Sequence, residues 1–199
     1  MSAPQQDRSR ETQRRLLSAA IEVLADNGWS ASTVGAVAQR AGVSRGAAQH
    51  HFPTREVLFT AAIDHLFTAR AAAVEAAAAA IPTDAVGRTR LLLEQLFSIY
   101  RGPYFRASVA IWSVASADAD LAARVRPIEA RLGRDVHHLA VTLLAADESA
   151  PNVRTTIQAT MDFLRGLALA ELLADDSVRR ARMLDRWAEI LDEYLVSCP

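Results

Sequence analysis

The chain has 199 residues, with 22 basic and 23 acidic side chains and a formal net charge of −1. This length can bury a real core, either as one domain or as a small domain joined to a larger one. The charge excludes a uniformly basic nucleic-acid binder, but residues 1–56 hold seven arginines against five acidic residues, which indicates a locally basic end on an acidic body.

An amphipathic helix is predicted from Arg8 to Asp26. Leu17, Ala20, Ile21 and Leu24 follow the spacing that places apolar side chains on one helical face, and Asn27-Gly28 closes the helix. Its first turns carry four arginines, which are Arg8, Arg10, Arg14 and Arg15. Two interpretations stay open for them: an ordinary solvated face, or non-specific attraction to a DNA backbone.

Two short capped helices follow around a tight turn. Thr33 is a suitable N-cap for a helix whose apolar positions include Val34, Val37, Ala38 and Ala41. Gly42 then fits the left-handed residue that ends such a helix, and Ser44 can cap a second helix from Arg45 to about His51. Two capped helices around a glycine-containing turn predict a helix-turn-helix.

The second short helix has a polar exposed face formed by Arg45, Gly46, Gln49 and His50. In a DNA-binding helix-turn-helix this helix enters the major groove, where Arg suits guanine and Gln suits adenine. Gly46 carries no side chain and would let the backbone approach DNA closely. The alternative is a solvated helical face, which composition alone favours for a lone Arg or Gln.

The run AGVSRGAAQHHFPTREVLF, from Ala41 to Phe59, resembles the recognition segment of the TetR (tetracycline repressor) family of bacterial transcriptional regulators. The resemblance implies a homodimer whose paired N-terminal domains bind a palindromic double-stranded DNA operator. It also implies release from DNA when a small-molecule effector enters the C-terminal domain. By position, the resemblance places phosphate contacts at Thr33, Ser44 and Arg55, and the major-groove face at Arg45, Gly46, Gln49 and His50.

Two residues depart from the family pattern. Gln49 stands where the family usually has a Tyr that touches the DNA backbone, and Gly35 stands where a longer side chain is common. We therefore expect the base readout to rest mainly on the second short helix.

The remaining chain is predicted to be helical throughout, which gives an all-α fold of about nine helices. Pro53 ends the recognition helix, and Thr54 can cap a long helix over 55–80 whose alanine-rich second half has high helix propensity. Further helices are expected over 84–100 with a Thr83 cap, from 102, and over 152–174 and 177–196. Asp118 or Asp120 can cap another long helix to about Leu144, interrupted or kinked near Pro127. We assign residues 1–56 to a DNA-binding domain and residues 57–199 to a ligand-binding and dimerisation domain.

The last two helices each carry an apolar stripe. The residues are Ile157, Met161, Leu164 and Ala168 in one helix, and Met183, Trp187, Leu191 and Tyr194 in the other. Such stripes are usually internal core. A reader of two half-sites one helical turn apart calls for a two-fold dimer, and the TetR resemblance places the dimer interface on these helices.

A cluster of aromatic residues includes Phe97, Tyr100, Tyr104 and Trp112. Most should be core, but a pocket between helices is typically apolar with a few polar groups, which Tyr and Trp can supply. Asp162 and Arg165 lie one turn apart in a helix that family members use to line the pocket. They are either candidate ligand contacts or an exposed ion pair.

The sequence offers no motif for an enzyme or a metal site. A Gly-rich phosphate loop, a Gly-x-Ser-x-Gly elbow and a His-Glu-x-x-His helix are missing from it, and we predict no cofactor, metal or catalytic residue. Two rivals stay open: a constitutive TetR-like DNA-binding or co-regulator dimer without a ligand response, and a helical-bundle enzyme.

The lone cysteine, Cys198, allows no internal disulfide, and no apolar run is long enough to span a membrane. The first residues contain no hydrophobic signal segment. We therefore expect a soluble cytoplasmic protein without membrane contact.

Overall fold

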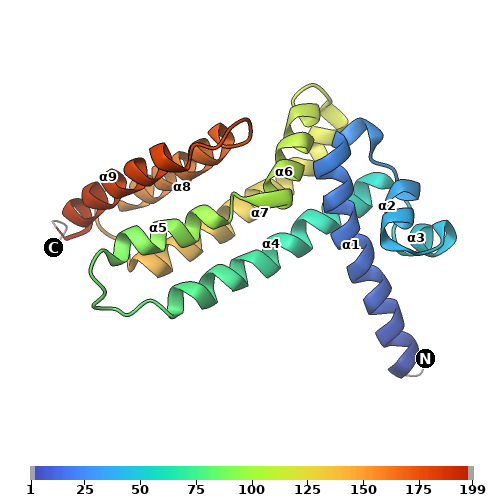
Figure 1. Cartoon of the computed structure of the whole chain (residues 1–199), viewed down its shortest axis with the longest axis horizontal. Helices are drawn as coiled ribbons and strands as arrows, with labels where there is room; N and C mark the ends of the chain where they lie inside the picture. The colour runs from blue at the N-terminus through green and yellow to red at the C-terminus, as the bar shows by residue number, and fades with distance from the viewer. Residues whose placement is uncertain (1–2, 197–199) are drawn as a thin grey trace. The chain divides into compact units, whose positions relative to one another are not determined.

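The computed structural model describes residues 3–196, except for the side chains of residues 3–6, 66, 69, 70, 195 and 196 (Figure 1). Cys198 lies outside the described residues. The described part of the chain has helices and no strand, which confirms the predicted all-α class. Its elements are α1 (Ala3–Ala31), α2 (Val34–Ala41), α3 (Arg45–His51), α4 (Arg55–Ala79), α5 (Arg88–Ser98), α6 (Gly102–Ala115), α7 (Ala119–Leu144), α8 (Val153–Ala170) and α9 (Ser177–Val196). Within those residues, no helix is both long and apolar enough to cross a membrane.

The chain packs as two compact units, and each unit contains segments that are distant in sequence. The first unit holds residues 1–69 and 102–130, and the second holds residues 70–101 and 131–199. The division falls inside α4 and inside α7. Compact packing therefore does not stop at residue 56, and the functional boundary there stays a prediction.

In the first unit, α1 packs against α2 and α6, and α2 packs against α3. The core includes Leu16, Leu24, Leu58 and Phe59, whose side chains are fully or almost fully buried. Helix α1 begins at Ala3, earlier than the predicted Arg8, since Ala3, Gln5 and Gln6 have high helix propensity and Pro4 is tolerated in a first turn. Its helical geometry breaks at Gly28, as the sequence predicts.

In the second unit, α5 packs against both α8 and α9. This packing buries Leu92, Leu93, Leu96 and Phe97 of α5. The predicted start of this helix at Asp84 with a Thr83 cap is wrong. Gly87 adopts a left-handed conformation (φ 68°) as the N-cap, and that conformation cannot continue into a right-handed helix, so α5 begins at Arg88.

The carboxylate of Glu148 anchors the loop between α7 and α8 within the second unit. His137 is buried, and its Nε2 lies 2.7 Å from Oε1 of Glu148, which Arg154 also contacts at 3.2 Å. An ionised carboxylate only accepts hydrogen bonds, so the His137 proton must lie on Nε2. The hydrogen bond from His137 lowers the pKa of Glu148 below its ordinary value.

The lowered pKa of Glu148 predicts a loss of stability in acid. A carboxyl whose folded pKa lies below its unfolded pKa contributes its full stabilisation above the unfolded value, and the contribution is lost as the pH falls through the folded pKa. We expect Glu148→Gln to lower the unfolding midpoint at neutral pH and to reduce its fall between about pH 5 and pH 3. Thermal unfolding followed by circular dichroism across this range tests the prediction. Glu75→Gln, at an exposed position of α4, is the matched control, and equal pH profiles for the two variants would contradict it.

Candidate nucleic-acid interface

Helix α2 has the two ends that its sequence predicts. The Thr33 hydroxyl accepts a hydrogen bond from the Ala36 N–H at 3.1 Å, which caps the N-terminus. At the other end Gly42 is left-handed (φ 63°), and the N–H groups of Gly42 and Val43 bond to the Gln39 and Ala38 carbonyls. This hydrogen-bond pair is the Schellman motif, and it turns the chain directly into the next helix.

Helix α3 begins two residues after that turn. The Ser44 hydroxyl accepts from the Ala47 N–H at 3.2 Å, and Ala48 is buried against the rest of the first unit. Phe52 follows the helix in an extended conformation, as expected for a residue before proline. The cap at one end and the proline at the other limit α3 to seven residues.

The predicted major-groove residues all lie on the surface of α3. Arg45, Gly46, Gln49 and His50 are exposed, whereas Ala48 between them faces the core. A Cβ added to Gly46 would meet no heavy atom within 4 Å, and its backbone is not left-handed. Neither packing nor backbone conformation within the chain therefore requires glycine at this position. The face is available to DNA, and contact with bases stays a prediction.

Thr33 and Ser44 combine capping with a free donor. Each hydroxyl oxygen accepts a backbone N–H, and each residue is exposed. Since a hydroxyl carries one proton as well as its lone pairs, both can donate to a phosphate oxygen without giving up the cap. The geometry therefore supports the phosphate contacts predicted at these two positions.

Arg55 makes contacts inside the first unit that its sequence position did not predict. Its guanidinium carbon lies 4.3 Å from the centroid of the Trp29 ring, and Nη1 donates to the Trp29 carbonyl at 3.3 Å. Its Nε is also 3.6 Å from Glu56 Oε1. A flat guanidinium stacks well on an indole face, so Arg55 ties the start of α4 to the end of α1. Its predicted phosphate contact would have to coexist with these contacts.

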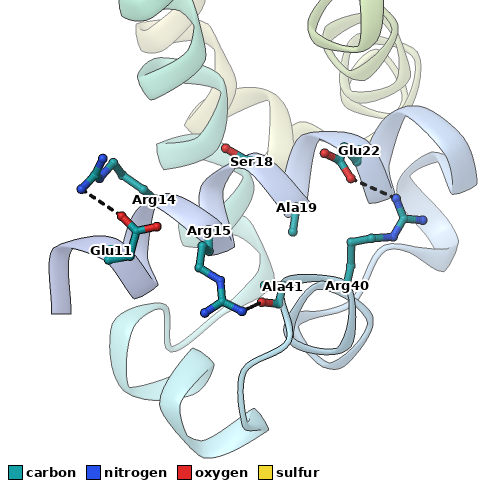
Figure 2. A pocket seen from close by; sticks show the side chains of 8 residues that line it. All are labelled: Glu11, Arg14, Arg15, Ser18, Ala19, Glu22, Arg40 and Ala41. Carbon is teal, nitrogen blue, oxygen red and sulfur yellow. Dashed lines mark hydrogen bonds and ion pairs between the residues drawn. The ribbon is translucent and has the colours of Figure 1, made fainter. Parts of the chain in front are cut away.

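A groove of about 550 Å³ runs between α1 and α2, and Figure 2 shows the charged side chains that line it. Arg14 pairs with Glu11 of the same helix at 2.9 Å. Arg40 of α2 reaches across to Glu22 and Asp26 of α1, at 3.2 and 3.4 Å, and these hydrogen bonds raise its pKa, with Glu22 the larger cause. These cross-helix contacts were missed from the sequence, although Glu22 and Asp26 at i and i+4 lie on one face of α1.

The aromatic ligand candidates fall in different compact units. Phe97 and Tyr100 are buried in the second unit, where the Arg180 guanidinium covers the Phe97 ring at 4.9 Å. Tyr104 and Trp112 belong to the first unit, where their rings lie 6.4 Å from Phe67 and 6.0 Å from Phe105, respectively. Within neither unit does the structure bring all of these residues together.

Asp162 and Arg165 form an ion pair at 3.1 Å on α8. The Asp162 side chain is largely exposed, whereas the Arg165 guanidinium also lies 5.5 Å from the centroid of the Tyr100 ring. This arrangement matches the ion-pair alternative and places Arg165 beside one aromatic candidate. A ligand role for the pair stays a prediction.

Comparison with known proteins assigns this helix-turn-helix to a family. The pattern described as "Bacterial regulatory proteins, tetR family" matches residues 16–62. Over 194 residues the chain is 30% identical to the HTH-type transcriptional regulator CymR of Pseudomonas putida, an alignment that covers 95% of this chain and 93% of that protein. The chain belongs to the TetR family. It is thus a DNA-binding transcriptional regulator and not an enzyme.

Solved structures share the TetR fold over most of the chain. A putative transcriptional regulator from Pseudomonas aeruginosa PAO1 has a TM-score of 0.72 at 18% identity, covering 96% of this chain and 93% of that one. The multidrug binding protein EbrR, in complex with imidazole, has a TM-score of 0.61 at 24% identity, covering 88% of this chain and 93% of that one.

The residues predicted for a TetR-type dimer interface divide by burial. Five are buried within the chain itself: Ile157, Met161, Leu164, Ala168 and Leu191. Met183 is 39% exposed, and Trp187 and Tyr194 are partly exposed. The five buried side chains are internal core of the second unit and leave almost no surface exposed to a partner. The homodimer itself stays a prediction.

Proposed function

We propose that this TetR-family protein is a homodimeric repressor of a palindromic operator, released by a small, largely apolar ligand. The observation that carries the proposal is the exposed face of α3, on which Arg45, Gln49 and His50 surround the bare backbone of Gly46. Thr33 and Ser44 supply hydroxyl donors at the starts of the two short helices. Base-reading groups framed by phosphate donors are the combination that sequence-specific binding needs.

A ligand response is supported by the fold and by one structural relative. EbrR, which shares the fold, is described as multidrug binding and is complexed with imidazole. In this chain the second unit places the buried Phe97 and Tyr100 near the guanidinium groups of Arg180 and Arg165. Ligand binding would favour a conformation in which two recognition helices no longer match successive major grooves.

The rival function is a constitutive DNA-binding dimer. It is favoured by the complete burial of Phe97 under the chain's own side chains, because a filled site leaves no room for an effector. Small apolar and aromatic compounds that raise the unfolding midpoint and release the protein from DNA would favour the repressor. Compounds that do neither, across a broad set, would favour the rival.

The first experiment is binding of the purified protein to DNA from its own upstream region. It is done at two salt concentrations with non-specific DNA as competitor, because phosphate contacts alone give salt-sensitive binding without sequence preference. Tight binding that survives the competitor supports the regulator. If this region fails, selection from a random duplex library tests whether the protein prefers any sequence, and enrichment of none would refute the proposal.

For the dimer, we propose an interface that uses the exposed side chains of α8 and α9. Leu169 and Met183 are exposed apolar residues on these helices, and the Trp187 ring stacks on Phe163 with centroids 4.8 Å apart at a partly exposed position. An unpaired carboxylate buried between protomers is costly. We expect Met183→Asp to shift the protein from dimer to monomer in sedimentation velocity, and Arg182→Asp, at an exposed neighbouring position, to leave the dimer in place. A Met183→Asp protein that stays dimeric would place the interface elsewhere.

A further inference from the structure

Arg15 of α1 contacts the turn that leads into the recognition helix. Its Nη2 donates to the carbonyl of Ala41, the last residue of α2 (Figure 2), and also lies 3.3 Å from the carbonyl of Gly42. Neighbouring Arg14 instead pairs with Glu11 on its own helix. Adjacent arginines on α1 therefore have different roles, and only Arg15 crosses to the helix-turn-helix.

The carbonyls that Arg15 contacts are ones that the helix end leaves open. The Schellman hydrogen bonds of α2 use the Ala38 and Gln39 carbonyls, so the Ala41 carbonyl has no partner within the helix. It also lies at the negative end of the helix dipole, where a cation is favoured. A guanidinium has several N–H donors in a fixed plane and can serve two neighbouring carbonyls.

Gly42 leaves room for this contact. A Cβ built on Gly42 would lie 3.0 Å from Arg15 Nη2, closer than side chains normally pack, and its φ of +63° disfavours other residues as well. The glycine thus ends α2 and admits the arginine at the same point. Ser44, which caps α3, follows two residues later, so little chain separates the anchored carbonyl from the recognition helix.

A second contact joins the same two helices, and here the arginine comes from α2 and its partners from α1. Arg40, in the last turn of α2, reaches Glu22 and Asp26, which lie further along α1 than Arg15. Figure 2 shows the ion pair of Arg40 with Glu22. The hydrogen bonds of Arg15 and the ion pairs of Arg40 together restrain α2 against rotation and sliding on α1. Of the two arginines, Arg15 contacts the part of the chain nearer to α3.

We propose that Arg15 is a positioning residue for DNA recognition: it holds the α2–α3 turn so that α3 presents its base-reading face, and it makes no contact with DNA phosphate. The proposal rests on the proposed sequence-specific binding. For Arg15 it replaces both interpretations that the sequence left open for the arginines of α1, because its side chain is engaged with backbone carbonyls. The Arg14 side chain is largely exposed and pairs with Glu11.

An arginine that contacts phosphate and an arginine that positions α3 have different effects on DNA binding when they are removed. A phosphate contact makes DNA binding more sensitive to salt. Its removal makes the negative slope of the logarithm of the association constant against the logarithm of salt concentration shallower by about 0.9, and it weakens binding to every sequence. A positioning contact changes the fit of α3 to base edges. Its removal weakens binding to the preferred sequence while binding to other DNA and the salt slope persist.

The experiment compares Arg15→Ala, Arg15→Lys and Arg14→Ala in the full-length protein. The probes are a duplex selected from a random library by the wild-type protein and a scrambled duplex of the same composition. Binding to each is measured at several salt concentrations, at a temperature well below the unfolding midpoint of every variant. Arg14→Ala removes the same charge one residue away and corrects for long-range electrostatics. Relative to it, we expect Arg15→Ala to bind the selected duplex about tenfold more weakly, with an unchanged salt slope and unchanged binding to the scrambled duplex.

Arg15→Lys keeps a cationic donor for the Ala41 carbonyl and should recover part of the lost preference. This variant also guards against misfolding, because it retains the charge and much of the length of the side chain. A lower unfolding midpoint with unaltered preference would reduce Arg15 to a stabilising residue, and a lower salt slope with equal loss on both duplexes would make it a phosphate contact. Either result overturns the inference alone. Failure of the wild-type protein to enrich any sequence would overturn the proposed function and the inference with it.

Discussion

Replacing Arg45 with alanine should weaken binding to the preferred duplex by about 1–3 kcal/mol, which is a loss of roughly five- to 150-fold. Arg45 is exposed at the first position of α3, directly after the Ser44 cap, and contributes nothing to the buried core. An arginine there can donate two parallel hydrogen bonds to guanine O6 and N7. We therefore expect the base preference to relax at one position in each half-site.

The measurement is affinity for a panel of duplexes in which each position of the preferred sequence is changed in turn. Arg106→Ala, at an exposed position of α6 in the same compact unit, is the control for loss of one positive charge. The unfolding midpoint should change little in either variant, since both side chains are exposed. Equal loss on every duplex, with a lower salt slope, would make Arg45 a phosphate anchor and would contradict its role as a reader.

The helix-turn-helix was predictable because its signals are local. Caps at Thr33 and Ser44, the left-handed Gly42 and the pre-proline Phe52 each depend on one or two neighbouring residues, and the structure confirms all four. Exposure of the α3 face follows from the same pattern, since Ala48 is the residue that turns inward. Such features are set by hydrogen bonds within a few residues, so one sequence suffices to predict them.

The contacts of long side chains were not predictable in the same way. Arg15 and Arg55 were candidates for DNA contact because of their charge and position, and both donate to backbone carbonyls 23 to 27 residues away in the chain, which the sequence did not predict. A flexible cation reaches whichever acceptor the tertiary fold brings close. Without the packing of α1 on α2, the sequence cannot tell a carbonyl from a phosphate as that acceptor.

The apolar stripes of α8 and α9 show a second limit of prediction from sequence. Period and composition establish that one face of α8 is buried, but not whether its own chain or a second copy covers it. Ile157 and Leu164 have no exposed surface within the single chain, because they lie in the core of the unit in which α5 packs on α8 and α9. The predicted start of α5 at Asp84 was wrong, although Thr83 is a suitable N-cap residue by type. The left-handed Gly87 is the N-cap instead, so the helix begins later.

Gly46→Ala should raise stability and lower DNA affinity together. Glycine inside a helix costs about 0.5–1 kcal/mol relative to alanine, and an added Cβ here meets no atom of the protein within 4 Å, so the free energy of unfolding should rise by about that amount. If the α3 backbone lies against DNA, the same methyl group overfills that contact. Overpacking typically costs about 1–3 kcal/mol, which corresponds to roughly five- to 150-fold weaker binding to the preferred duplex.

The opposite signs distinguish a functional glycine from a structural one. Gly133→Ala, in α7 of the other compact unit, makes the same chemical change where a Cβ also meets nothing within 4 Å, and it should raise stability without affecting DNA binding. Gly35→Ala is a closer control, because it lies in the neighbouring helix α2 and its Cβ would make only ordinary contact, with Thr33 Oγ1 at 3.8 Å. Thermal unfolding and duplex affinity measured on the same three variants decide the matter. A Gly46→Ala protein that is more stable and binds DNA as tightly as the wild type would show that the α3 backbone keeps its distance from the duplex, and the readout would then have to be carried by the longer side chains of Arg45, Gln49 and His50.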